Sequence, residues 1–220
     1  MAAGRTNDRP DQAHIRAVYA RQARLRIYDP LLGLGLLGSG SRTRRRMVDH
    51  LGLAAGDRVL DIGCGTGLNF EALEAAVGPG GEIVGLDATP EMLELAQAHL
   101  DRRGWRNVHL VEDDAAALPF EDRSFAAACS TLALSGVPEW RRALSEAWRV
   151  TMPRGRLALI EASRLRGPWR LAPLRPLYRW LYAWQPPGPD IGEALAQLTD
   201  PVGTETALGG IWTILWVTKG

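Results

Sequence analysis

The chain has 220 residues, 46% of them hydrophobic, and its 26 basic and 25 acidic side chains leave a formal net charge of +1. This length suits one domain that buries a core without disulfides or metals, and no apolar segment reaches the roughly 20 residues that cross a bilayer. Because its two cysteines lack metal-ligand spacing and its first residues lack a signal-peptide pattern, the sequence predicts a cytoplasmic protein with no bound metal.

The first 56 residues predict a helical cap. Residues 1–12 are polar, and a helix is expected from near Gln12 through Ala23. A second helix is expected from Ser41, placed to cap it, to Leu51. Residues 1–46 also carry ten arginines against three aspartates, which is an uneven distribution for a chain of low net charge.

From residue 57 to residue 161, predicted strands and helices alternate. Strands are expected at 58–62, 82–86, 107–112, 125–130 and 156–161, and helices at 67–77, 90–103 and 138–150. Glycine and proline signals predict turns at 78–81, 103–104 and 152–155. This pattern predicts a Rossmann-like, doubly wound α/β fold with a mostly parallel sheet covered on both faces.

A glycine-rich turn follows the first strand of this core. Gly63, Gly65 and Gly67 alternate directly after the apolar strand that Asp61 and Ile62 end. Each glycine removes a Cβ that would keep a ligand from the main chain, and the next helix offers unpaired N–H groups. The spacing is Gly-x-Gly-x-Gly, with Leu68 where a dinucleotide fingerprint needs its third glycine, which disfavours nicotinamide.

Four motifs in this order resemble the class I S-adenosylmethionine (SAM)-dependent methyltransferases. The first is the strand and glycine turn at 59–69. The others are the acidic, small, Thr-Pro, x-Met segment at 87–93, the Asp-Ala-Ala-Ala-Leu-Pro-Phe segment at 114–120, and the helix, turn and strand at 143–156. The resemblance implies one methyltransferase domain over 1–220, with a cap at 1–56 and a SAM-binding core at 57–161. The aromatic, proline-broken and basic composition of 162–200 predicts a lid over the acceptor. The resemblance implies an antiparallel hairpin at 201–220, formed by 202–206 and 211–218, which completes a seven-stranded sheet.

The same resemblance implies a set of SAM-binding residues. The glycine turn would wrap the methionine end, Asp61 would face its ammonium directly or through water, and Asp87 would accept both ribose hydroxyls. Asp114 would accept from the adenine amino group, although the neighbouring Asp113 leaves that choice open. An alternative role for Asp87 is to cap the helix that begins at Thr89-Pro90. The full set of expected SAM-binding residues is Tyr19, Tyr28, Asp61, Gly63, Cys64, Gly65, Gly67, Asp87, Ala88, Met92, Asp114, Ala115 and Thr131.

No catalytic base stands out in the sequence. The four histidines, His14, His50, His99 and His109, are all expected on surfaces or helix faces. Tyr19 and Tyr28 on the cap are better placed, because a tyrosine can hydrogen-bond the carboxylate of SAM, but ordinary packing of an amphipathic helix explains them equally well. Thr131 and Leu132 would line the methyl-transfer site. They lack the Asn/Asp-Pro-Pro-aromatic motif of enzymes that methylate nucleic-acid amino groups, so we expect no nucleic-acid partner.

The acceptor is expected to be a small, lipophilic or aromatic molecule. The cap and the stretch at 118–125 resemble the subgroup that contains quinone C-methyltransferases and phosphatidylethanolamine N-methyltransferases, whose acceptors are membrane lipids. The arginine, tryptophan and tyrosine side chains at 164–184 favour peripheral contact with an anionic bilayer, but they suit a soluble hydrophobic acceptor equally well. Two alternatives stay open: a SAM-binding partner subunit without activity, and a nicotinamide-dependent oxidoreductase.

Overall fold

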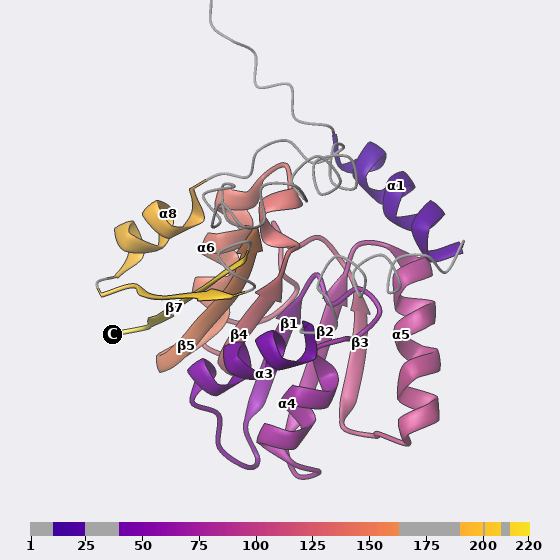
Figure 1. Cartoon of the computed structure of the whole chain (residues 1–220), viewed down its shortest axis with the longest axis horizontal. Coiled ribbons are helices and arrows are strands. Elements are labelled where there is room, and N and C mark those ends of the chain that lie inside the picture. Colours follow the sequence, from indigo (N-terminus) through magenta and orange to yellow (C-terminus); the bar gives the residue numbers. More distant parts are fainter. Residues whose placement is uncertain (1–10, 25–39, 163–189, 200, 208–211) are drawn as a thin grey trace, which may run out of the picture.

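One twisted sheet organises the protein (Figure 1). The computed structural model describes residues 11–24, 40–162, 190–199, 201–207 and 212–220. Seven strands within these ranges form a sheet of order β3-β2-β1-β4-β5-β7-β6. The first five strands in that order are parallel, and β7 runs antiparallel to both β5 and β6. The strands are β1 Arg58–Ile62, β2 Glu82–Asp87, β3 Val108–Glu112, β4 Phe125–Thr131, β5 Thr151–Ala162, β6 Gly203–Ala207 and β7 Trp212–Thr218.

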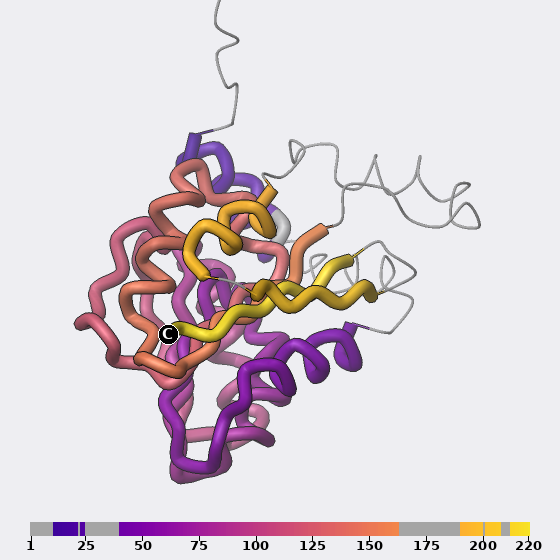
Figure 2. The backbone as a smooth tube through the Cα atoms, turned by 90° about the vertical axis from the view of Figure 1, so that its left-hand side faces the viewer, coloured from indigo at the N-terminus to yellow at the C-terminus, as the bar shows by residue number. Residues whose placement is uncertain are grey.

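Helices cover both faces of this sheet. The described helices are α1 Gln12–Arg24, α3 Gly40–Leu51, α4 Phe70–Val77, α5 Pro90–Arg103, the 3-10 turn η1 Leu134–Gly136, α6 Trp140–Val150 and α8 Ile191–Leu198. One core cluster joins α3, α4 and α5 to alternate residues of the strands, and a second joins α6 and α8 to the residues between them. Viewed from the β6–β7 edge, α3 and α6 lie on opposite sides of the sheet (Figure 2). The predicted doubly wound α/β fold and its antiparallel C-terminal hairpin are therefore confirmed.

The predicted elements agree best where local signals are strong. Strand β1 and helix α5 have the predicted bounds, and α5 ends as expected at Gly104, whose φ of 71° is left-handed. Helix α4 begins at Phe70 rather than at residue 67, because Gly67 has a φ of 82° and its N–H donates to the Cys64 carbonyl in a turn. Helix α3 begins at Gly40, so the prediction that Ser41 caps it was wrong.

The predicted turn at 152–155 is instead part of β5. The Arg154 N–H donates to the Lys219 carbonyl at 2.7 Å, and the Lys219 N–H donates to the Gly155 carbonyl at 2.9 Å. Arg154 takes a φ of 65°, and the pairing of β4 with β5 shifts register between Phe125 and Ala127. Pairing with the end of the chain therefore extends the strand through a segment whose proline and glycine predicted a turn.

One further segment differs from the expectation drawn from the sequence. Helix α8 lies inside the span expected as a lid, yet Ile191 and Leu195 are buried in the second core cluster. Within the described ranges, no helix is both long and apolar enough to cross a membrane. Tyr28 and the aromatic, basic residues at 164–184 lie outside the described residues.

Candidate functional site

A cleft opens at the carboxyl ends of the parallel strands. The chain leaves β1 toward β2 on one side, while β4 lies on the other, and ligands of open α/β sheets bind at such a switch point. The cleft has an empty volume of about 710 Å³, including space open to solvent. Eight expected SAM-binding residues line it, namely Tyr19, Gly63, Gly65, Asp87, Ala88, Met92, Asp114 and Ala115.

The three glycines of the turn have different local reasons to be glycine. All three have positive φ, at 67° for Gly63, 55° for Gly65 and 82° for Gly67. A Cβ on Gly63 would meet the Ala133 Cβ at 2.3 Å, and one on Gly67 would meet the Phe70 ring at 2.5 Å, so these two allow close packing. A Cβ on Gly65 would have nothing within 4 Å. Gly65 is therefore the glycine whose missing side chain leaves space for a ligand.

Asp87 holds the glycine turn and the entry to α5 together. One carboxylate oxygen accepts the Gly65 N–H at 2.9 Å, and the other accepts the Thr89 N–H at 2.9 Å. Thr89 is the N-cap residue of α5 and Pro90 starts the helix, so Asp87 braces the turn before the helix rather than capping it. Burial raises the pKa of Asp87, and the backbone hydrogen bonds lower it in part.

Asp61 is the most enclosed acid at this end of the sheet. It is fully buried at the end of β1 and does not line the cleft, whereas Gly63, two residues later, does. Its Oδ1 accepts from the Asn69 amide at 2.8 Å and from the Cys129 thiol at 3.5 Å. Its Oδ2 has no hydrogen-bond partner among the residues that the structure describes. Burial raises the pKa of Asp61 to about 6, although the Asn69 and Cys129 hydrogen bonds and the charge of Arg44 oppose the rise.

The loop after β3 supplies two more carboxylates. Asp113 and Asp114 both line the cleft together with Ala115. Asp114 accepts the Ala116 N–H at 2.9 Å, and Asp113 accepts the Asp114 N–H at 2.7 Å. The structure thus brings both acids to the position expected for an adenine contact and does not choose between them.

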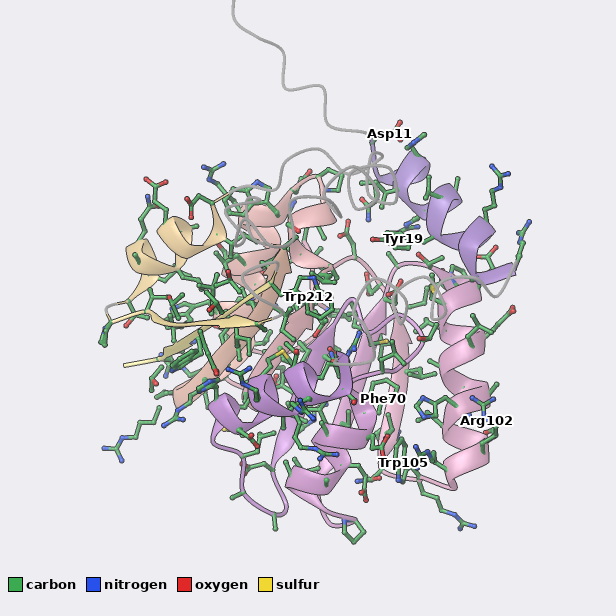
Figure 3. The ribbon with its side chains drawn as sticks, in the orientation of Figure 1. Asp11, Tyr19, Phe70, Arg102, Trp105 and Trp212 are labelled. Atoms are coloured by element: carbon green, nitrogen blue, oxygen red, sulfur yellow. The ribbon has the colours of Figure 1, made fainter. Side chains whose placement is uncertain are left out.

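One face of α1 covers the cleft. Gln12, Ile15, Arg16 and Tyr19 line it, at the spacing of one helical stripe. Tyr19 extends from α1 over the strand ends (Figure 3). An ion pair between Arg24 and Glu91, at 2.7 Å, links the end of α1 to α5. Of these lining residues the sequence pointed only to Tyr19, because the position of α1 over the cleft is set by tertiary packing.

The wall opposite the acids is apolar. Leu132, Ala133, Gly136, Val137 and Pro138 line it, and all lie in the segment that follows β4.

Thr131, at the end of β4, turns its hydroxyl toward Asn69 at 3.2 Å and toward the Met47 sulfur at 3.6 Å rather than into the cleft. Cys64 is buried beside Gly85, and burial raises the pKa of its thiol. Gly67, Cys64 and Thr131 were expected to bind SAM, but they pack behind the residues that line the cleft.

Glu161 lies at the carboxyl end of β5, where the sequence suggested no special role. Its side chain is buried, and Oε1 has no hydrogen-bond partner within the described part of the chain. Burial raises its pKa to about 7, although hydrogen bonding from the Ser135 hydroxyl and amide opposes the rise. Because Ser135 belongs to η1, Glu161 sits next to the apolar wall.

The histidines lie apart from this site, as expected, and none of the four lines the cleft. His50 is the most constrained of them. Its ring stacks on Trp216 with centroids 3.6 Å apart, and its Nε2 lies 2.7 Å from a carboxylate oxygen of Glu205. Burial lowers the pKa of His50. The contact joins α3 to the C-terminal hairpin and is far better suited to packing than to catalysis.

Comparison with known proteins matches this geometry to a family. Residues 59–155 match the family described as a methyltransferase domain. A demethylmenaquinone methyltransferase of Staphylococcus aureus (strain JH9) is 37% identical over 140 residues, which are 64% of this chain and 54% of that protein. Residues 59–155 are those of a SAM-dependent methyltransferase domain. The resemblance seen in the four motifs is confirmed, and the cofactor of this class of domain is SAM.

Solved structures agree with the methyltransferase domain at the level of fold. A SAM-dependent methyltransferase from Aquifex aeolicus aligns with a TM-score of 0.63 and 23% identity over 80% of this chain and 89% of that one. The [4+2]-cyclase SpnF aligns with a TM-score of 0.64 and 21% identity over 96% of each chain. The chain spans about half the length of the curated relatives it matches. Its activity and acceptor therefore need an argument from the site itself.

Proposed function

We propose that this protein transfers a methyl group from SAM to a small, apolar or aromatic acceptor. The observation that carries the proposal is a single cleft with two unlike walls: the open main chain at Gly65 with Asp87 on one side, and the apolar segment 132–138 on the other. The first wall suits a polar nucleoside. The second wall suits a hydrophobic methyl acceptor, which has to lie close to that nucleoside.

The residues present fit SAM. Asp87 offers two oxygens to the ribose hydroxyls, and the open space at Gly65 admits the ligand against the main chain. Asp113 or Asp114 accepts from the adenine amino group while the Ala115 N–H meets a ring nitrogen, and Met92 and Ala88 pack beside the nucleoside. Tyr19 reaches over the site from α1, and the unpartnered Oδ2 of Asp61 marks the side for the ammonium.

SAM supplies an electrophilic methyl carbon on a sulfonium, and the protein has to align an acceptor with it. Well-oriented reactants can gain roughly 7–11 kcal/mol from positioning alone. The segment 132–138 holds an acceptor by apolar contact, and α1 excludes water from above. Thr131 keeps the end of β4 in place through its bond to Asn69, so its part in methyl transfer is to support the wall.

A quinol is the acceptor class we infer. The curated relative named above is a demethylmenaquinone methyltransferase, and a quinol ring is flat and apolar enough for the wall at 132–138. The test is incubation with methyl-labelled SAM and 1,4-naphthohydroquinone under reducing conditions, with the product identified by mass spectrometry. We expect a singly methylated ring and an equal amount of S-adenosylhomocysteine (SAH). Equal amounts of label in the organic phase with wild-type protein and with a Gly65→Val variant would contradict the proposal.

Binding without transfer is the alternative that this assay separates. The cyclase SpnF shares the fold, which shows that the fold by itself does not establish methyl transfer. A SAM-binding partner subunit would raise its melting temperature with SAM or SAH and yet methylate no acceptor in a panel of quinols, phenols and amines. A nicotinamide-dependent enzyme would instead show a higher melting temperature with NADH.

Peripheral membrane contact is a separate part of the proposal. Arg42 and Arg45 are exposed on α3, and the chain carries five further arginines between 164 and 179. Basic side chains are attracted to anionic lipid by about 1 kcal/mol each. We expect co-sedimentation with vesicles of phosphatidylglycerol but not of phosphatidylcholine. Equal recovery in the supernatant with both would remove this part, and a cytoplasmic location stays a prediction.

A further inference from the structure

Asn69 has no role as a helix cap, although it stands at a cap position. It is the residue before α4, where an asparagine usually accepts a hydrogen bond from the first turn. Here its backbone has φ −84° and ψ −23°, and its side chain makes no capping bond. The side chain is instead buried and turned toward the ends of β1 and β4. The Asn69 side chain therefore makes its hydrogen bonds to residues of β1 and β4 instead of to the first turn of α4.

The Asn69 amide links the end of β4 to the end of β1 through two hydrogen bonds, one accepted and one donated. The Thr131 hydroxyl donates to Asn69 Oδ1 at 3.2 Å, and Asn69 Nδ2 donates to Asp61 Oδ1 at 2.8 Å. The Thr131 hydroxyl also lies 3.6 Å from the Met47 sulfur, and a hydroxyl can donate or accept, whereas an ionised carboxylate can only accept, so Asp61 fixes which way the Asn69 amide faces. With its oxygen facing Thr131, Asn69 can only present its NH₂ group to Asp61.

The result is a carboxylate with one satisfied and one open oxygen. Asp61 Oδ1 accepts from the Asn69 amide and the Cys129 thiol, while the buried Oδ2 has no partner in the described ranges. Buried polar atoms without a partner are rare in native proteins, and an unpaired buried carboxylate oxygen is costly unless a donor meets it. Gly63, two residues beyond Asp61, already lines the cleft. Asp61 itself is fully buried and does not line the cleft, so its open oxygen lies behind the glycine turn that does.

We propose that Asn69, whose amide oxygen accepts from Thr131, is a positioning residue that presents Asp61 Oδ2, directly or through a water, to the ammonium of the methionine end of SAM. This inference rests on the proposed function, because it assigns a role within the SAM site. It predicts that loss of Asn69 affects only ligands that carry the amino-acid end. Two nucleosides make the comparison: SAH has that end, and 5′-methylthioadenosine lacks it.

The test is isothermal titration of both nucleosides into wild-type protein and an Asn69→Leu variant. Leucine has a similar volume but no hydrogen-bonding group. We expect SAH to bind about 10-fold or more weakly to the variant, as for a lost hydrogen bond to a charged group, and methylthioadenosine to bind within about 2-fold of wild type. Equal weakening of both nucleosides, or of neither, would overturn the inference.

A second pair of variants keeps the test decisive if Asn69→Leu does not fold. Thr131→Val removes the hydroxyl that donates to the amide oxygen, and Ser130→Ala removes a neighbouring buried hydroxyl that has no partner among the described residues. We expect Thr131→Val to weaken SAH several-fold relative to methylthioadenosine and Ser130→Ala to change neither. Identical behaviour of the two variants would overturn the inference. Wild-type protein that binds neither nucleoside would overturn the proposed function and the inference with it.

Discussion

Glu161 should make the protein less stable as the pH rises, and the Glu161→Gln change should remove that effect. Burial raises the pKa of this carboxyl from 4.5 to about 7, so the folded state holds its proton longer than the unfolded state does. For such a group the stabilising contribution is complete below pH 4.5 and is lost as the pH rises toward 7. A gap of this size corresponds to about 3 kcal/mol, at ~1.4 kcal/mol per pKa unit.

The measurement is urea unfolding of wild type and Glu161→Gln at pH 5 and pH 8. Glutamine is neutral at both, so the difference in unfolding free energy between the two proteins should shift by up to about 3 kcal/mol in favour of the variant at pH 8. Glu121→Gln, at an exposed position, controls for the loss of one negative charge. The same pH dependence of the unfolding free energy in wild type and Glu161→Gln would refute the reasoning, because the Glu161 carboxyl would then have the same pKa in the folded and unfolded states.

Three further changes separate binding from stability. Gly65→Val should abolish SAH binding in titration calorimetry while costing only about 1–2 kcal/mol of unfolding free energy, because the left-handed φ is strained but the space beside it is open. Gly63→Ala should cost more stability, about 3 kcal/mol in urea unfolding, because its Cβ would lie 2.3 Å from that of Ala133; a smaller loss than for Gly65→Val would contradict this. Asp87→Ala should weaken SAH by at least about 10-fold and leave the far-ultraviolet circular dichroism of a folded domain, and unchanged SAH affinity would remove Asp87 from the site.

Much of the fold could be predicted from the sequence, because its signals are local. The alternation of apolar runs with helical patterns gave the order of the core elements, and Pro90 and Gly104 marked both ends of α5. The extension of β5 through Pro153 could not be predicted, since it depends on pairing with Lys219 at the far end of the chain. The proline and glycine of this segment favour a turn, but its pairing with a distant part of the chain makes it a strand.

The candidate site divides in the same way. Residues that touch the main chain of the glycine turn, such as Asp87, are tied to a motif and were expected. Asn69 was not, because an asparagine before a helix predicts a cap, and only the structure shows its side chain bonded to Asp61. Glu161 and Arg16 were also unexpected, because burial of the first and the position of the second over the cleft are products of tertiary packing.

The central claim is that the cleft at the ends of β1, β2 and β4 binds the nucleoside of SAM against the main chain at Gly65. The most direct measurement is titration of SAH into wild-type protein, with the folded state checked by a cooperative melting transition. The account predicts saturable binding of one SAH per chain and a higher melting temperature in its presence. Well-folded protein that shows neither saturation nor a thermal shift would contradict it.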